Sequence, residues 1–199
     1  ATTGSLSYTP VANANGTAVI TVTVTDNGGT TNSGVATTTR TFTVAVTAVN
    51  DAPTLTTVST LTGATEDTAL TISYATLAAA ANAADVDVGD TLSFRVEAVT
   101  TGTLTKNGSA VVAGTTLLGA TESLVWTPAA NANGTLNAFT IKAWDGTTTS
   151  ATAIQVQVTV TAVNDAPTLA AITNPAAILE EASAQTVSLT GIAAGGGET

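Results

Sequence analysis

The chain has 199 residues, of which 4 are basic and 14 acidic, for a net charge of −10 and a pI near 4.1. This acidity argues against nucleic acid and anionic membrane surfaces as partners, because both recruit Lys and Arg. No apolar run reaches the roughly 18 residues of a membrane-inserted span. The sequence contains no Cys and no His, which excludes disulfides, thiolate metal sites and the commonest catalytic base.

Residues 1–52 contain two segments in which apolar and polar residues alternate, VITVTV and TFTVAV. Alternation with period two predicts β-strands that have one buried and one solvent-facing side. Together with a strand expected around SLSY, they are interpreted as strands E, F and G of a β-sandwich. The loop TDNGGTTNSG between the two alternating segments carries a four-residue insertion relative to the later copy of this region.

Residues 53–166 predict a complete sandwich of seven antiparallel strands. Phe94, Trp126 and Phe139 fall on inward phases of these strands and are expected to anchor the core. Asn107-Gly108 predicts a tight hairpin turn, and YATLAAAANAAD predicts one or two helical turns. The expected strands are A near 55–61, B at 69–74, C at 91–99, D near 110–112, E at 123–126, F at 138–144 and G at 152–162.

An internal repeat divides the chain. TAVNDAPTL begins at Thr47 and again at Thr161, a spacing of 114 residues, and SLSYTPVANANGT from Ser5 matches SLVWTPAANANGT from Ser123. We therefore predict an all-β chain of tandem sandwiches, one complete and two partial. Residues 1–52 are the C-terminal half of one repeat, 53–166 a complete repeat, and 167–199 strands A and B of the next.

The acidic residues concentrate in loops. Successive loops of an antiparallel sandwich alternate between its two ends, so the loops after strands B and F share one tip with the linker that enters strand A. Five carboxylates are expected at this tip: Asp51, Asp85, Asp87, Asp90 and Asp145. The opposite tip collects the loops after strands A and E and the exit from strand G, with Glu66, Asp67, Asn131, Asn133, Asn164 and Asp165.

Five carboxylates at one tip repel each other unless a cation neutralises them. Ca²⁺ is the candidate, because it takes six to eight oxygen ligands from carboxylates, Asn side chains and backbone carbonyls, whereas Mg²⁺ demands stricter geometry. The alternative that these Asp, Asn and Gly residues only form turns and keep the surface soluble stays open. ADVDVGD is not an EF-hand loop, because Gly89, Asp90 and Val96 occupy positions that need other residues.

VNDAP before strand A, the Glu66-Asp67 pair and the Asp85-x-Asp87 pair resemble cadherin-type repeats, specifically the cadherin-like and immunoglobulin-like repeats of giant bacterial RTX-type adhesins and surface proteins. The resemblance implies extracellular sandwiches strung end to end and stiffened by calcium at their joints. It implies that Asn50 and Asp51 are linker ligands, with Glu66, Asp85 and Asp87 as further ligands. The single linker Asp, where animal cadherins have a longer acidic run, implies fewer calcium ions per joint.

These features predict a non-enzymatic extender or stalk of a secreted or cell-surface fibre, whose partners are neighbouring repeats or copies of the same chain. The alternative is a glycan- or protein-binding module at Trp144-Asp145-Gly146, although packing of Trp144 against a neighbouring loop or domain is favoured. Paired catalytic carboxylates among Asp85, Asp87 and Asp90 are disfavoured, because nothing marks a pocket or a nucleophile–base pair.

The two partial repeats are complementary in strand content. Three strands cannot close a core, so residues 1–52 are expected to leave one apolar face uncovered. Strands A and B of one copy are then expected to pack beside strands E, F and G of the next, through the same chain or by strand exchange. The uncovered side chains are Ile20, Val22, Val24, Phe42, Val44 and Val46.

Overall fold

The computed structural model describes residues 3–28 and 34–196. Backbone contacts divide the chain into two units. The first comprises Ala1–Asp51 with Val86–Val88, and the second comprises Ala52–Asp85 with Gly89–Thr199.

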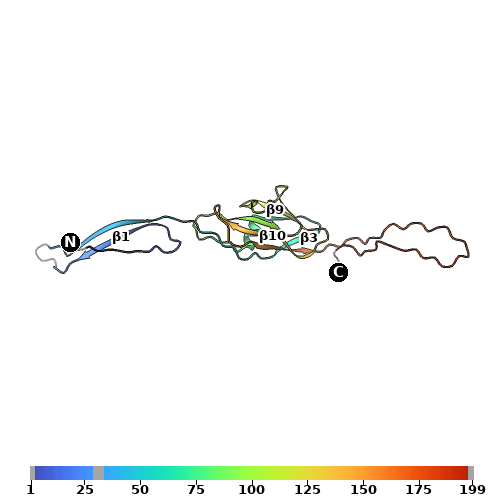
Figure 1. Cartoon of the computed structure of the whole chain (residues 1–199), viewed down its shortest axis with the longest axis horizontal. Coiled ribbons are helices and arrows are strands. Elements are labelled where there is room, and N and C mark those ends of the chain that lie inside the picture. Colours follow the sequence, from blue (N-terminus) through green and yellow to red (C-terminus); the bar gives the residue numbers. More distant parts are fainter. Residues whose placement is uncertain (1–2, 29–33, 197–199) are drawn as a thin grey trace. The chain divides into compact units, whose positions relative to one another are not determined.

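The first unit is built on a two-stranded antiparallel ribbon of β1 (Gly16–Thr25) and β2 (Thr37–Val46) (Figure 1). These strands confirm the two alternating segments. The strand expected around SLSY is not observed, because the described residues before Gly16 form no strand. Residues 29–33 of the insertion loop lie outside the described part of the chain.

The second unit contains a five-stranded sheet in the order β3-β11-β10-β5-β8. All its pairs are antiparallel except β3 with β11, which run parallel, so the expectation of a wholly antiparallel sandwich is wrong at this edge. The strands are β3 (Leu61–Thr65), β5 (Ser93–Val99), β8 (Leu117–Leu118), β10 (Gly134–Trp144) and β11 (Ile154–Thr161).

A four-stranded sheet in the order β4-β9-β6-β7 completes this unit, together with the two-turn helix α1 (Tyr74–Ala80). Ser73 caps the helix by accepting a hydrogen bond of 3.1 Å from the backbone N–H of Thr76. The short helix confirms the expectation for YATLAAAANAAD. The strands are β4 (Leu70–Ser73), β6 (Thr103–Lys106), β7 (Ser109–Ala110) and β9 (Ser123–Thr127).

Two strand predictions for the complete sandwich differ from the structure. Strand A lies at Leu61–Thr65 instead of 55–61, because Thr54 and Val58 form only isolated bridges with Ala84 and Ala81. The single strand D expected near 110–112 is replaced by the β6–β7 hairpin and by β8, so the seven-strand count is not confirmed. The hairpin turns at Asn107-Gly108 as predicted, with both residues at positive φ.

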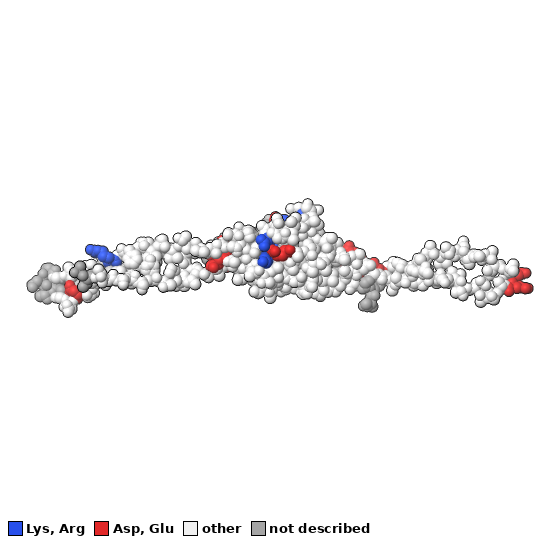
Figure 2. Space-filling model, in the orientation of Figure 1, with Lys and Arg blue, Asp and Glu red and all other residues white. Residues whose placement is uncertain are grey.

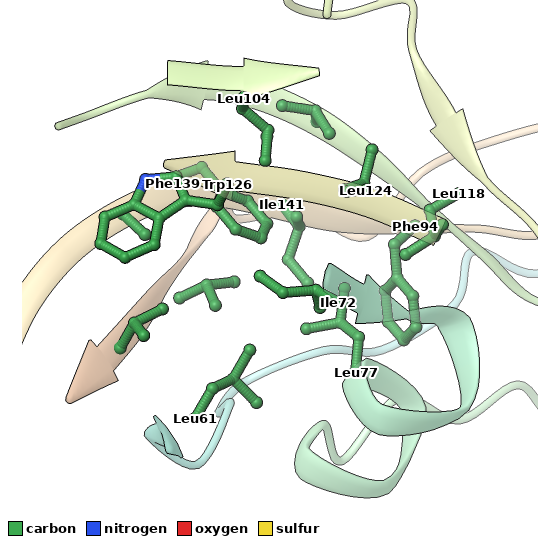
Figure 3. Close-up of a cluster of buried hydrophobic side chains, with 14 of the residues drawn as sticks. Leu61, Ile72, Leu77, Phe94, Leu104, Leu118, Leu124, Trp126, Phe139 and Ile141 are labelled. Atoms are coloured by element: carbon green, nitrogen blue, oxygen red, sulfur yellow. The ribbon is translucent and has the colours of Figure 1, made fainter. Parts of the chain in front are cut away.

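The core of the second unit lies between its two sheets. Phe94, Trp126 and Phe139 are at most 1% exposed, which confirms them as core anchors. Leu77 of α1 points toward Ile72 and adds helix surface to this layer (Figure 3). The indole Nε1 of Trp126 donates a 2.9 Å hydrogen bond to the carbonyl of Thr101, so its buried polar atom is satisfied.

The described part of residues 167–199 forms no named strand, so the expected strands A and B of a third repeat are not observed there (Figure 1). One isolated antiparallel bridge joins Thr168 to Ala193. Two backbone hydrogen bonds, 3.0 and 3.2 Å long, form this bridge. The same pair of hydrogen bonds joins Thr54 to Ala84, and Thr54 lies 114 residues before Thr168.

The repeated sequences adopt the same local structure in both copies. Asn13 and Asn131, the first Asn of each NANGT, lie at φ 58° and 56°. Gly16 pairs with Val46 in β1–β2 as Gly134 pairs with Val160 in β10–β11. The two ribbons therefore share one register, except for the bulge at Ala138 in β10.

Candidate metal centre

Three carboxylates converge at one end of the sandwich in the second unit. Asp85 and Asp90 come from the loop between α1 and β5, and Asp145 follows directly after β10. One carboxylate oxygen from each of the three lies within 4.8 Å of the others. The sequence predicted this convergence from the alternation of loops, and the structure brings these three residues together.

The Asp145 side chain is held in place by the turn that it opens. Its Oδ1 accepts hydrogen bonds of 2.5 and 2.6 Å from the backbone N–H groups of Thr147 and Thr148. The turn passes through Gly146 at φ 104°, a conformation that favours glycine. Because Asp145 is only 9% exposed, this end of the cluster is both fixed and largely removed from water, while Asp85 is half-buried and Asp90 exposed.

The donor set fits Ca²⁺. Calcium binds oxygen at about 2.3–2.6 Å, so two ligands on one ion lie at most about 5 Å apart. The spacing within 4.8 Å satisfies this limit for all three carboxylates at once. Three carboxylates are hard oxygen ligands, which suit calcium better than transition metals that prefer nitrogen or sulfur ligands.

Asp51 and Asp87 form a separate group, within the first unit. The backbone N–H of Asp51 donates a 2.7 Å hydrogen bond to Oδ2 of Asp87. The side-chain amide of Asn50 donates to the carbonyl of Asp51 at 2.9 Å. A hollow of about 190 Å³ is lined by Asp51, Asp87, Asn13 and Asn15, among other residues. The five acids predicted at one tip thus appear as two groups, one of three and one of two.

Sequence reasoning did not assign Asn13 and Asn15 to a site. Both belong to the NANGT segment, and their counterparts Asn131 and Asn133 were placed at the other tip of the complete repeat. Carrying that placement one repeat upstream would have put Asn13 and Asn15 beside the linker that contains Asp51.

At the opposite end of the sandwich, Glu66 is 1% exposed and joins three segments. Its Oε1 accepts a 2.5 Å hydrogen bond from the backbone N–H of Val163, and its Oε2 accepts one of 3.2 Å from the side chain of Asn133. Asp67 accepts a 3.0 Å hydrogen bond from the backbone N–H of Asn131. The predicted grouping at this tip is therefore present, and Glu66 and Asp67 act there as acceptors for protein N–H groups.

Asn164 and Asp165 repeat the geometry of the upstream linker. The amide of Asn164 donates to the carbonyl of Asp165 at 3.1 Å, as Asn50 does to Asp51. Asp165 and Asn131 line a hollow of about 520 Å³ together with Gly195 and Gly196. In both copies of the repeat, the Asp of the linker (Asp51 or Asp165) and the NANGT segment before it thus line the same hollow.

The basic residues Arg95 and Lys106 neutralise acids away from the tips. Arg95 forms a 2.6 Å ion pair with Glu97, and Lys106 forms a 2.7 Å ion pair with Glu122. The hydrogen bond from Lys106, reinforced by the backbone N–H of Gly119, lowers the pKa of Glu122, and partial burial opposes this shift. In the space-filling view, acidic and basic atoms are adjacent on the flank of the sandwich, while other acidic atoms lie at its ends (Figure 2).

Trp144 is half-buried and lies beside Arg95. The guanidinium carbon of Arg95 is 5.7 Å from the centroid of the indole ring, a distance at which a cation–π attraction operates. The ring therefore packs against a side chain of the adjacent strand β5, and the glycan-binding alternative stays a prediction.

Comparisons with known proteins identify the family. No curated protein matches the chain. No helix in the described ranges is long and apolar enough to cross a membrane. The family model of the cadherin-like domain matches residues 49–161, which is more than half of the chain and includes β3–β11 and the three converging carboxylates. The chain belongs to the cadherin-like domain family.

Proposed function

We propose that this chain is an extender of a secreted or cell-surface fibre or adhesin, and that Ca²⁺ stiffens the connections between its successive repeats. Cadherin-like domains are typically extracellular and non-enzymatic, which supports the adhesion role. The VNDAPT motifs resemble those of bacterial RTX-type adhesins. This resemblance extends the proposed adhesion role to that of a long surface fibre built from many such repeats.

The convergence of Asp85, Asp90 and Asp145 carries the calcium proposal. A calcium ion bound there would offset two of the three negative charges that otherwise repel each other. Its chemistry is that of a structural cross-link, because it takes oxygen ligands from several loops at once. Asp145 is already oriented by its turn, so the chain loses little side-chain freedom at this ligand when it binds the ion.

Asp87 extends the proposal from the sandwich to the linker. It lies between Asp85 and Asp90 in sequence, and its carboxylate accepts the backbone N–H of the linker residue Asp51. An ion held by Asp85 and Asp90 restricts the loop that carries Asp87, and that loop is hydrogen-bonded to the linker. We therefore expect calcium to reduce the freedom of the linker as well as to stabilise the sandwich.

Calorimetric titration of the calcium-depleted chain with Ca²⁺ tests this function. We expect saturable binding that Asp90→Asn weakens at least tenfold, because one of the three carboxylate charges is lost. Glu97→Gln is the matched control, since Glu97 lies on β5 and pairs with Arg95, and it is expected to leave binding unchanged. Equal weakening by both substitutions would show that only general surface charge attracts the ion, and would overturn the proposed site.

A further inference from the structure

Two of the four basic residues of the chain lie directly opposite each other on the sandwich of the second unit. Lys142 of β10 pairs in register with Arg95 of β5, and both residues are half-buried. Successive side chains of a strand point to opposite faces of the sheet, and the neighbours of both cations along the chain point into the core. These neighbours are Phe94, Val96, Ile141 and Ala143, all at most 1% exposed. Arg95 and Lys142 therefore lie side by side on the outer face of the five-stranded sheet.

This part of the outer face holds more positive charge than the protein neutralises. Glu97 forms a 2.6 Å ion pair with Nε of Arg95, whereas Lys142 forms no ion pair within the described residues. Like charges directly opposite each other destabilise a sheet, and the single carboxylate of Glu97 balances only one of the two cations. A second anion between Arg95 and Lys142 would therefore relieve the remaining repulsion.

The N–H groups that remain on these two cations suit a carboxylate. Arg95 uses the N–H of Nε for Glu97, and in the described ranges no hydrogen bond involves its two terminal nitrogens or Nζ of Lys142. A guanidinium fork can hold both oxygens of a carboxylate, while an ammonium group adds a point charge beside it. Two positive charges and the one negative charge of Glu97 leave a single positive charge. This charge matches a carboxylate better than the nearly doubly charged phosphate monoester.

The side chains on either side of Lys142 suit a sugar ring. Thr140, Lys142 and Trp144 are every second residue of β10 and form one row on the outer face. The indole ring of Trp144 packs beside Arg95, with 5.7 Å between the guanidinium carbon and the ring centroid. An indole offers apolar surface to the C–H groups of a sugar, and the hydroxyl group of Thr140 can exchange hydrogen bonds with sugar hydroxyls. We call Arg95, Lys142, Trp144 and Thr140 the outer patch.

We propose that the outer patch binds an acidic saccharide of the hexuronate class. The carboxylate of the sugar lies between the guanidinium group of Arg95 and the ammonium group of Lys142. Its ring packs on Trp144, and its hydroxyls reach Thr140. The patch belongs to β10 and β5, which are interior strands of the five-stranded sheet, so the backbone beneath it is held by pairing on both sides. The inference adds a ligand to the proposed extender role and does not depend on calcium.

Titration of the full chain with tetragalacturonate in chelator, at low ionic strength, tests the inference. The chelator removes calcium, which would otherwise bridge the acidic sugar to the acidic loops. Trp126 is fully buried and Trp144 half-buried, so the tryptophan fluorescence of Trp144 reports on the patch. We expect a saturable change with tetragalacturonate and none with its methyl ester, which has the same sugar chain without the charge. Binding of both forms alike, or of neither, would overturn the inference.

The Trp144→Phe chain shows whether the fluorescence change arises at the patch. This substitution keeps an aromatic ring but removes the indole, and Trp126 remains as the other tryptophan of the chain. We expect the change on adding tetragalacturonate to disappear. A change of unaltered size in Trp144→Phe would place the ligand away from the outer patch and would overturn the assignment.

Charge substitutions test the two cations. Lys142→Gln is expected to weaken binding about tenfold, because it removes one of the two charges that hold the carboxylate. Arg40→Gln is the matched control, since Arg40 is exposed on β2 of the first unit, and it is expected to leave binding unchanged. Arg95→Lys keeps the partner of Glu97 charged but loses the guanidinium fork, and it is expected to weaken binding about fivefold.

The thermal midpoint of each variant shows that it is folded before its affinity is compared. Equal effects of Lys142→Gln and Arg40→Gln would show that only general charge attracts the sugar, and would overturn the outer patch as a site. Because calcium is absent from these titrations, their failure would leave the calcium role intact. Failure of calcium binding would likewise leave the saccharide site intact.

Discussion

Oε1 of Glu66 lies 2.5 Å from the backbone N of Val163, a residue 97 positions further along the chain. A fully buried carboxylate thus ties the end of β3 to the exit of β11. We expect Glu66→Gln to lower the free energy of unfolding by about 1–3 kcal/mol, because hydrogen bonds to a charged acceptor are stronger than those to a neutral one.

Urea unfolding followed by tryptophan fluorescence measures this effect, since Trp126 reports on the core. Asp67→Asn is the matched control, because Asp67 is exposed and is expected to change stability by less than about 0.5 kcal/mol. If Glu66→Gln were as mild as Asp67→Asn, the hydrogen bonds that Glu66 accepts from Val163 and Asn133 would not contribute to stability.

Gly102 is expected to be harder to replace than Gly108, although both are glycines of the sandwich at positive φ. A Cβ at this position would lie 2.2 Å from the carbonyl oxygen of Thr127, and the backbone is at φ 67°. Gly108 has a similar φ of 78°, but nothing lies within 4 Å of its Cβ position. Gly108→Ala should therefore cost only the backbone penalty of about 1–2 kcal/mol, and Gly102→Ala clearly more. The thermal midpoints of the Gly102→Ala and Gly108→Ala proteins measure this difference. Equal midpoints would contradict the close approach of Thr127 to Gly102.

The sequence predicted the architecture well where alternation was regular. The strands β4, β5, β9, β10 and β11 lie within a few residues of their expected positions, because period-two patterns mark strands with one buried face. The strand A prediction was wrong because the apolar residues of 55–61, Leu55, Val58 and Leu61, lie three apart and do not follow the period of a strand. Only Leu61–Thr65 joins the edge of β11, and that choice depends on the tertiary partner. The β6–β7 hairpin and β8 are too short to leave such a pattern.

The candidate site could be predicted in part. The alternation of loops between the two ends of the sandwich was enough to predict that Asp85, Asp90 and Asp145 lie together, because this alternation depends only on strand order. It could not show that Asp87 turns to the backbone of Asp51, since neighbouring residues in a loop point in different directions. That Glu66 is buried and hydrogen-bonded to a backbone N–H also depends on packing that the sequence does not reveal.

Glu122 is expected to contribute to the acid sensitivity of the sandwich. The hydrogen bond from Lys106 lowers its folded pKa below the ordinary 4.5, so its stabilisation is present above that value and lost as the pH falls through the lowered folded pKa. Glu122→Gln should flatten the decline in stability between about pH 5 and pH 3. Urea midpoints measured across this range test it, and parallel profiles for the two proteins would contradict it.

The most direct test of calcium stiffening is a thermal melt of the full chain with millimolar calcium against the same chain with chelator. Ca²⁺ at 100 times its dissociation constant, bound only to the folded state, adds about 2.7 kcal/mol of stability. At roughly 2–4 °C per kcal/mol, or more for a small domain, the midpoint should rise by several degrees. The account predicts this rise for the native chain and its loss in Asp90→Asn, while an unchanged midpoint in the native chain would contradict it.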